Sequence, residues 1–193
     1  MSASQPQPEL TPAEQVTARQ YDKAISLCRD IFTKKLHDYG SSWRMLRPAS
    51  VTDQILIKAL RIRSLQMKGV AMVDEGILPE FIAIVNYGAI GLIQLQLGLS
   101  NSPDLDAARA IELYDKTIAE TRSLMFAKNH DYDEAWRLMR VSSLDDIILQ
   151  KIHRTKEIED LGGNTLISEG VDANYQDMIN YSVFAIIKLT ENE

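Results

Sequence analysis

The sequence contains a single cysteine, no Gly-rich phosphate loop, no Ser-His-Asp set and no Cys/His spacing typical of zinc ligands. These absences exclude several common kinds of catalytic site, although they do not exclude activity. Because Cys28 has no second cysteine to pair with, it cannot form an internal disulfide. We interpret it as an inert helix residue in a reducing compartment.

Long hydrophobic runs are also missing. The most apolar segment, from Phe81 to Ile93, is far shorter than the ~20 residues that span a bilayer, and it contains Asn86. The first ten residues lack both the basic start and the apolar stretch of a signal peptide. We therefore expect a cytoplasmic protein without a membrane partner, in which this apolar segment forms a buried core helix.

Basic residues are outnumbered by acidic ones, with 21 Lys and Arg against 27 Asp and Glu and a net charge of -6. A protein that binds duplex nucleic acid needs a basic surface to neutralise phosphates. The charge balance therefore argues against a duplex partner. It leaves small ligands open, and the sequence also leaves open a homo-oligomer.

No segment shows the two-residue alternation of a half-buried β-strand, whereas helix signals recur. Thr11-Pro12-Ala13-Glu14 combines an N-cap, a proline at the first helical position and a capping-box glutamate. We expect a short helical turn around each tryptophan. The helices that we predict cover about 12–37, 50–69 and 79–97 in the first half, and 102–129, 143–162 and 173–189 in the second.

Residues 21–69 and 114–162 are close copies of each other, so the chain is a tandem duplication. We predict an all-α fold in which two three-helix units pack as a pseudo-twofold helical bundle. The first repeat covers 11–100 and the second 101–193, with one shared core. Residues 1–10 are rich in Pro, Gln and Ser, and we expect them to be disordered.

Positions that keep the same residue in both copies are mostly polar or aromatic, whereas apolar positions exchange among Leu, Ile, Met and Val. A core mainly requires volume and pattern, so identity at a polar position indicates a more specific requirement. The repeated pairs are Lys35/Lys128, His37/His130, Asp38/Asp131, Tyr39/Tyr132, Trp43/Trp136, Arg44/Arg137, Arg47/Arg140, Ser50/Ser143, Asp53/Asp146, Lys58/Lys151, Arg61/Arg154, Glu75/Glu169, Asn86/Asn180 and Tyr87/Tyr181.

The loop after the first helix of each copy contains one tryptophan and two arginines. Guanidinium groups suit phosphates and an indole can stack on a base, so this loop is a candidate nucleotide-binding element. The alternative is a tryptophan that fills a gap between helices, with arginines paired to acids. Two copies with the same spacing favour a ligand. The residues are Trp43, Arg44 and Arg47 in the first copy, and Trp136, Arg137 and Arg140 in the second.

The second helix of each copy carries two cations one turn apart. They suit a polyphosphate, and they equally suit ordinary salt bridges. We include them among the nucleotide-binding candidates. The residues are Lys58 and Arg61 in the first copy, and Lys151 and Arg154 in the second.

Asn86 and Asn180 lie within apolar helices, where an unsatisfied buried amide costs about 1–3 kcal/mol. Each needs a partner, which is either a ligand or an interhelical hydrogen bond that fixes packing. Asp177 lies one turn before Asn180 and faces the same way, whereas Ala83 takes the equivalent position in the first copy. The second half is therefore the better candidate for a metal site.

The combined pattern K-x-HDYG-x-x-W, S-x-x-D, K-x-x-R, an acidic EG loop and a helix containing NY resembles the nucleotide-modification-associated domain family, the first of that name. Each half resembles one copy, so the resemblance covers most of the chain after residue 20. It implies a protein that handles nucleotides, linked to nucleotide modification or to control of the nucleotide pool.

That family is distantly similar to all-α nucleoside-triphosphate pyrophosphatases of the MazG and dimeric dUTPase type. The similarity implies a Mg²⁺-dependent pyrophosphohydrolase that acts on a nucleotide or nucleoside polyphosphate. The E-E-x-x-E motif of those enzymes is absent at the expected place. A non-catalytic nucleotide- or protein-binding module is the alternative. The implied catalytic and metal-binding residues are Asp131, Asp146, Glu169 and Asp177, with Asp38, Asp53 and Glu75 as counterparts in the first half.

Overall fold

A computed structural model describes residues 10–69, 76–163 and 169–191. All regular secondary structure in these ranges is helical, which confirms the all-α prediction. The segment expected to be disordered lies outside them, apart from Leu10. The elements are α1 (Pro12–Tyr39), η1 (Ser42–Met45), α2 (Pro48–Lys68), α3 (Leu78–Leu97), α4 (Ala107–Tyr132), η2 (Ala135–Leu138), α5 (Val141–Asp160) and α6 (Val171–Thr190).

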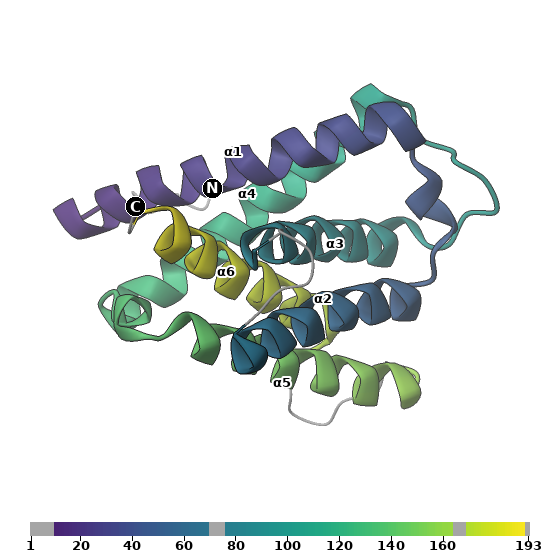
Figure 1. Ribbon diagram of the computed structural model, residues 1–193. Coiled ribbons are helices and arrows are strands. Elements are labelled where there is room, and N and C mark those ends of the chain that lie inside the picture. Colours follow the sequence, from purple (N-terminus) through teal and green to yellow (C-terminus); the bar gives the residue numbers. More distant parts are fainter. Residues whose placement is uncertain (1–9, 70–75, 164–168, 192–193) are drawn as a thin grey trace, which may run out of the picture.

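The helices form three layers of two (Figure 1). α1 and α4 make one outer layer, α3 and α6 the central layer, and α2 and α5 the other outer layer. Each layer thus pairs one helix of the first repeat with its equivalent in the second, as the tandem duplication predicts. One hydrophobic core contains residues from all six α-helices.

The start of α1 follows its sequence signal. The backbone N–H of Thr11 donates to Glu14 Oε2 at 2.8 Å, and the N–H of Glu14 donates to Thr11 Oγ1 at 3.2 Å. These reciprocal bonds satisfy two amide groups that the first turn leaves without helical partners. The buried face of α1 then recurs every three or four residues, at Tyr21, Ala24, Cys28, Phe32 and Leu36.

Several other helix starts differ from the prediction. α4 begins at Ala107 and not near Ser102, because the side chain of Asp106 accepts a hydrogen bond of 2.8 Å from the N–H of Arg109 and caps the helix there. α2 and α5 begin before the predicted positions 50 and 143, with Arg47 and Arg140 at the N-cap positions. Consequently Asp53 and Asp146 lie beyond the first turn of their helices.

The central helices approach each other closely at two glycines of α3. A Cβ atom at Gly91 would lie 2.8 Å from the ring of Tyr175, and one at Gly88 would lie 2.6 Å from Ile179. Although α3 has the length and composition of a membrane span, 61% of its apolar window is buried inside the protein. This burial confirms the predicted core helix.

Ion pairs between the two repeats occur in reciprocal sets, as expected of a pseudo-twofold arrangement. One set joins α1 to α4 and the other joins α2 to α5. The members are largely exposed, so each pair contributes little to stability. The pairs are Arg29 with Asp115, Arg122 with Asp22, Arg63 with Asp146, and Lys156 with Asp53.

Candidate functional site

Each repeat contains a cavity between the end of its first helix, its 3-10 turn and its third helix. The first cavity has a volume of about 520 Å³ and the second about 240 Å³. Only the first falls within the roughly 300–1,000 Å³ typical of small-molecule sites. Equivalent residues line both: Lys35, Tyr39, Trp43, Asn86 and Tyr87 in the first, and Lys128, Tyr132, Trp136, Asn180 and Tyr181 in the second.

Trp136 packs within the second cavity. Its ring stacks on Phe184 with 4.4 Å between centroids and 6° between planes, and the guanidinium of Arg137 lies 4.4 Å from the indole centroid. Only 6% of Trp136 is exposed. These contacts are those of the gap-filling alternative, and they help to explain the smaller volume of the second cavity.

Trp43 has a different environment, because Ile90 takes the position of Phe184 in the first repeat. No aromatic ring among the described residues stacks on Trp43. Its half-buried indole lines the first cavity together with Ile90. The first cavity therefore has indole surface available to a planar ligand.

Asp177 lies between two lysines in the second repeat. Its carboxylate is 2.8 Å from Nζ of Lys128 and 2.7 Å from Nζ of Lys151, and Glu169 lies at 3.9 to 4.0 Å from the same two lysines. Partial burial lowers the pKa of Lys128, but the hydrogen bond and the charge of Asp177 outweigh this effect and the pKa lies above its ordinary value. The negative charges of Asp177 and Glu169 thus lie beside the positive charges of the two lysines.

The equivalent cluster in the first repeat is arranged differently, since Ala83 replaces Asp177. Lys58 lies 3.3 Å from the buried carboxylate of Glu80, and Arg61 also pairs with Glu80. Lys35 forms no ion pair with any residue in the described ranges. Glu75, a candidate from the sequence, lies outside those ranges.

The two buried asparagines have interhelical partners. Asn86 donates from Nδ2 to the carbonyl of Cys28 at 3.0 Å, and the hydroxyl of Tyr114 donates to its Oδ1 at 2.8 Å. Asn180 has the same arrangement with Thr121 and Tyr21, at 3.3 and 2.8 Å. These bonds are those of the packing alternative, although both asparagines also line their cavities.

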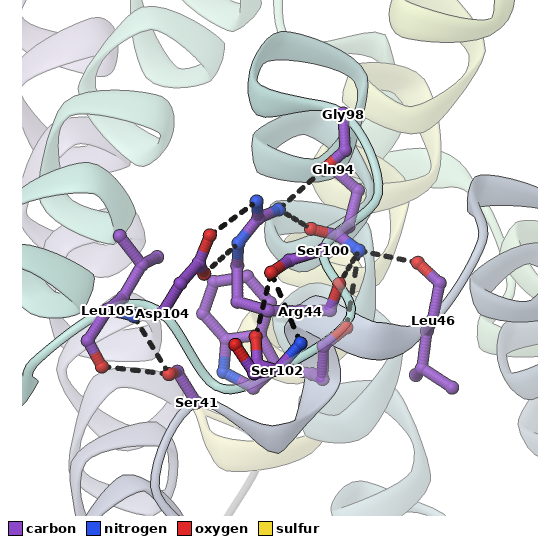
Figure 2. Close-up of polar contacts among 10 residues, drawn as sticks. Ser41, Arg44, Leu46, Gln94, Gly98, Ser100, Ser102, Asp104 and Leu105 are labelled. Carbon is purple, nitrogen blue, oxygen red and sulfur yellow. Dashed lines mark hydrogen bonds and ion pairs between the residues drawn. The ribbon is translucent and has the colours of Figure 1, made fainter.

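Arg44 is buried in a polar network at the end of α3 (Figure 2). Its Nε donates to Asp104 at 2.8 Å, its Nη1 donates to the carbonyl of Gly98 at 2.7 Å, and it also contacts Gln94. Only 3% of Arg44 is exposed. The guanidinium therefore joins η1 to the connection between the repeats, and Arg44 is not among the described residues that line either of the two cavities.

The other arginine candidates also lie away from the cavity linings. Arg137 donates to Glu134 at 2.9 Å and to Thr17 at 2.7 Å, which joins η2 to α1. Arg154 pairs with Glu157 at 3.2 Å. Arg47 and Arg140 are exposed at the N-caps of α2 and α5.

Of the four acids proposed as metal ligands, Asp177 and Glu169 lie beside the same two lysines, whereas Asp131 and Asp146 lie elsewhere. Asp131 is exposed at the end of α4, Asp146 pairs with Arg63 at 2.6 Å, and Asp177 is held by its two lysines. On the first-half side, Asp38 lies beside His37 at the exposed end of α1. Within the described residues, no three Asp, Glu, His or Cys side chains form a group that could hold a metal ion. These side chains do not fit a common Mg²⁺ site as they stand, and the site stays a prediction.

A family model described as nucleotide modification associated domain 1 matches the chain twice, at residues 35–95 and 128–189. The chain belongs to this family. The two matches coincide with the two repeats and confirm the resemblance seen in the sequence. Each match to nucleotide modification associated domain 1 includes the lysine, tryptophan and asparagine of one cavity. Comparison with curated proteins and with solved structures gives no significant match.

Sequence reasoning noted the repeated Lys35 and Lys128 but did not place them in the site. The presence of a lysine at the same position in both copies could have indicated a role in the site, because core packing does not explain a lysine near the end of both first helices. The roles of Glu80 and Phe184 could have been suspected for the opposite reason, because these two positions differ between the copies. Asn174 is the equivalent of Glu80, and Ile90 is the equivalent of Phe184. Differences between the copies thus mark where the two cavities diverge.

Proposed function

We propose that this protein binds a nucleotide in the first cavity, with the base against Trp43 and the phosphate end near Lys35. The observation that carries the proposal is a cavity of about 520 Å³, within a nucleotide modification associated domain, that contains an indole free of stacked rings from the described residues. The second cavity is smaller, and its indole packs against Phe184.

The chemistry of the lining suits a base better than it suits a sugar alone. Trp43, Tyr39 and Tyr87 supply aromatic surface, and Ile82 and Ile90 supply apolar surface. Stacking of a base on an aromatic side chain contributes about 1–3 kcal/mol and tolerates every base, because each base has a π-face. Lys35 is the cation among the lining residues, and it lies at the end of α1.

Mg²⁺-dependent pyrophosphohydrolysis, implied by the similarity to MazG-type enzymes, is a more specific alternative to nucleotide binding alone. Its leading ligand, Asp177, would have to exchange two lysine contacts of 2.7 and 2.8 Å for the metal ion. The first repeat has Ala83 at that position. The contacts therefore favour binding over hydrolysis as the proposed function, and pyrophosphate release that requires Mg²⁺ would favour the alternative.

A thermal-shift screen tests the proposal. The purified full-length protein is heated with nucleoside mono-, di- and triphosphates of each base, once with EDTA and once with Mg²⁺. A ligand that binds only the folded state raises the apparent melting temperature by mass action. We expect stabilisation in EDTA by at least one nucleotide, reduced in the Trp43→Ala variant. The absence of a shift with every nucleotide, under both conditions, would contradict the proposal.

A further inference from the structure

The second repeat shows where an anion sits in this architecture. Asp177 places one carboxylate between Lys128 and Lys151, at 2.8 and 2.7 Å. The first repeat keeps both lysines, as Lys35 and Lys58, but has Ala83 where the carboxylate would be. The duplication has therefore kept the two cations of this cluster in the first repeat without the acid that neutralises them in the second.

Lys58 pairs with the buried carboxylate of Glu80 in the first cluster, and Arg61 pairs with the same carboxylate. Lys35 adds a positive charge at the cavity wall, and no acid among the described residues forms an ion pair with it. In the second cluster Asn174 replaces Glu80, and Asp177 pairs with both Lys128 and Lys151. An anion that enters the first cavity would give Lys35 a partner of the kind that Lys128 has in Asp177.

We infer that Lys35 and Lys58 bind the phosphate of a nucleoside monophosphate, at the position that the carboxylate of Asp177 occupies in the second repeat. This inference rests on the proposed function and names its ligand class. A phosphate monoester carries a charge of about -1.5 to -2 near neutral pH, which matches two lysines. Ala83 is half-buried and lines the first cavity together with Lys35, and its methyl side chain is smaller than the carboxylate side chain of Asp177.

A triphosphate fits the same surroundings less well. Its additional phosphates would need cations besides Lys35 and Lys58, and the described residues that line the first cavity include no cationic side chain other than Lys35. The nearby Arg44 is buried and bonded to Asp104 and Gly98, while Arg61 pairs with Glu80. Additional negative charge would also face the buried carboxylate of Glu80. Monophosphates should therefore bind more tightly than triphosphates.

Calorimetric titration in EDTA tests the ligand class. AMP, GMP, CMP, UMP and dTMP are each compared with the corresponding nucleoside and triphosphate, using the full chain. For the base that binds, we expect the monophosphate to bind about 10- to 100-fold more tightly than the nucleoside, as charge-assisted hydrogen bonds imply. We also expect it to bind more tightly than the triphosphate.

Two variants locate the phosphate. Ala83→Asp puts the carboxylate of the second repeat into the first, and Lys35→Ala removes a proposed contact. Both should lower monophosphate affinity at least about tenfold while nucleoside affinity changes little. Lys128→Ala, the same change in the other repeat, is the matched control and should leave affinity unchanged. Circular dichroism checks that each variant is folded.

The outcomes separate the inference from the function on which it rests. Equal or tighter binding of triphosphates, or wild-type monophosphate affinity in a folded Ala83→Asp variant, would overturn the inference and leave nucleotide binding intact. Equal binding of the nucleoside would also overturn it, because the phosphate would then contribute nothing. If no nucleoside or nucleotide binds, both the inference and the proposed function fail.

Discussion

The hydroxyl of Tyr21 donates a hydrogen bond of 2.8 Å to Oδ1 of Asn180, and the equivalent Tyr114 makes the same bond to Asn86. Each bond joins the first helix of one repeat to the third helix of the other. All four side chains are buried. The repeats are therefore interlocked through a reciprocal pair of polar contacts within an otherwise apolar core.

Tyr114→Phe should lower the free energy of unfolding by about 1–3 kcal/mol, because Oδ1 of Asn86 loses its donor while the amide stays buried. Urea denaturation followed by circular dichroism measures this change. Tyr39→Phe is the matched control, since 72% of Tyr39 is exposed, and it should have no measurable effect. A Tyr114→Phe protein as stable as the wild type would show that the bond contributes nothing.

Asp145 is a buried carboxyl on α5 whose two oxygens accept no hydrogen bond from the described residues. Its equivalent, Thr52, contacts Glu159 at 2.7 Å and the hydroxyl of Tyr175 at 2.6 Å. Burial raises the pKa of Asp145 to about 7, the charge of Arg63 opposes this shift, and the charge of Asp146 adds to it. The folded protein therefore favours the protonated acid.

This pKa makes stability depend on pH. From about pH 4 to pH 7 the folded state holds a proton that the unfolded chain releases, so the free energy of unfolding falls as the pH rises through this window, by up to about 4 kcal/mol. Asp145→Asn should remove this contribution and raise the urea midpoint above that of the wild type at pH 8. A similar pH dependence in both proteins would contradict the assignment to Asp145.

Arg44→Ala should destabilise the protein by about 3 kcal/mol or more, because it leaves the buried polar groups of Gln94 and Gly98 without their donor. Thermal and urea unfolding provide the measurement. Arg47→Ala, three residues later in the same loop and exposed, should change stability by less than about 0.5 kcal/mol. Equal effects of the two substitutions would contradict the structural role of Arg44.

Asp177→Ala should lower stability more at low than at high salt, because Lys128 and Lys151 lose the carboxylate between them and repel each other. Urea midpoints at the two ionic strengths measure the effect. Asp172→Ala changes an exposed acid on the first turn of the same helix and serves as the comparison. A loss of stability independent of salt would point to packing instead of charge.

The helices and their duplication could be predicted because their signals are local. The capping box at Thr11 and Glu14 positions the start of α1, and Gly69 ends α2 in a left-handed conformation that glycine adopts easily. Because the chain is duplicated, the sequence pattern of each helix occurs in both repeats and supports the same prediction twice. The start of α4 was misplaced because Asp104, which resembles a first-turn acid, instead bonds to the distant Arg44.

The difference between the two cavities could not be predicted from local patterns. Trp43 and Trp136 stand in nearly the same sequence context, yet Phe184 stacks on one of them and Ile90 lies near the other. Likewise, the repeated lysines did not reveal that Asp177 pairs with both Lys128 and Lys151, whereas Glu80 pairs with Lys58 in the first repeat. These outcomes depend on which side chains meet across helices that are far apart in the sequence.

Tryptophan fluorescence tests the central claim most directly, because the chain has two tryptophans and each lies in one cavity. Trp136→Phe leaves Trp43 as the reporter of the first cavity, and Trp43→Phe leaves Trp136 as the reporter of the second. Titration of the Trp136→Phe protein with the nucleotide that stabilises it best should quench the emission of Trp43 to saturation, while the Trp43→Phe protein shows no saturable change. Saturable quenching of Trp136 alone would contradict nucleotide binding in the first cavity.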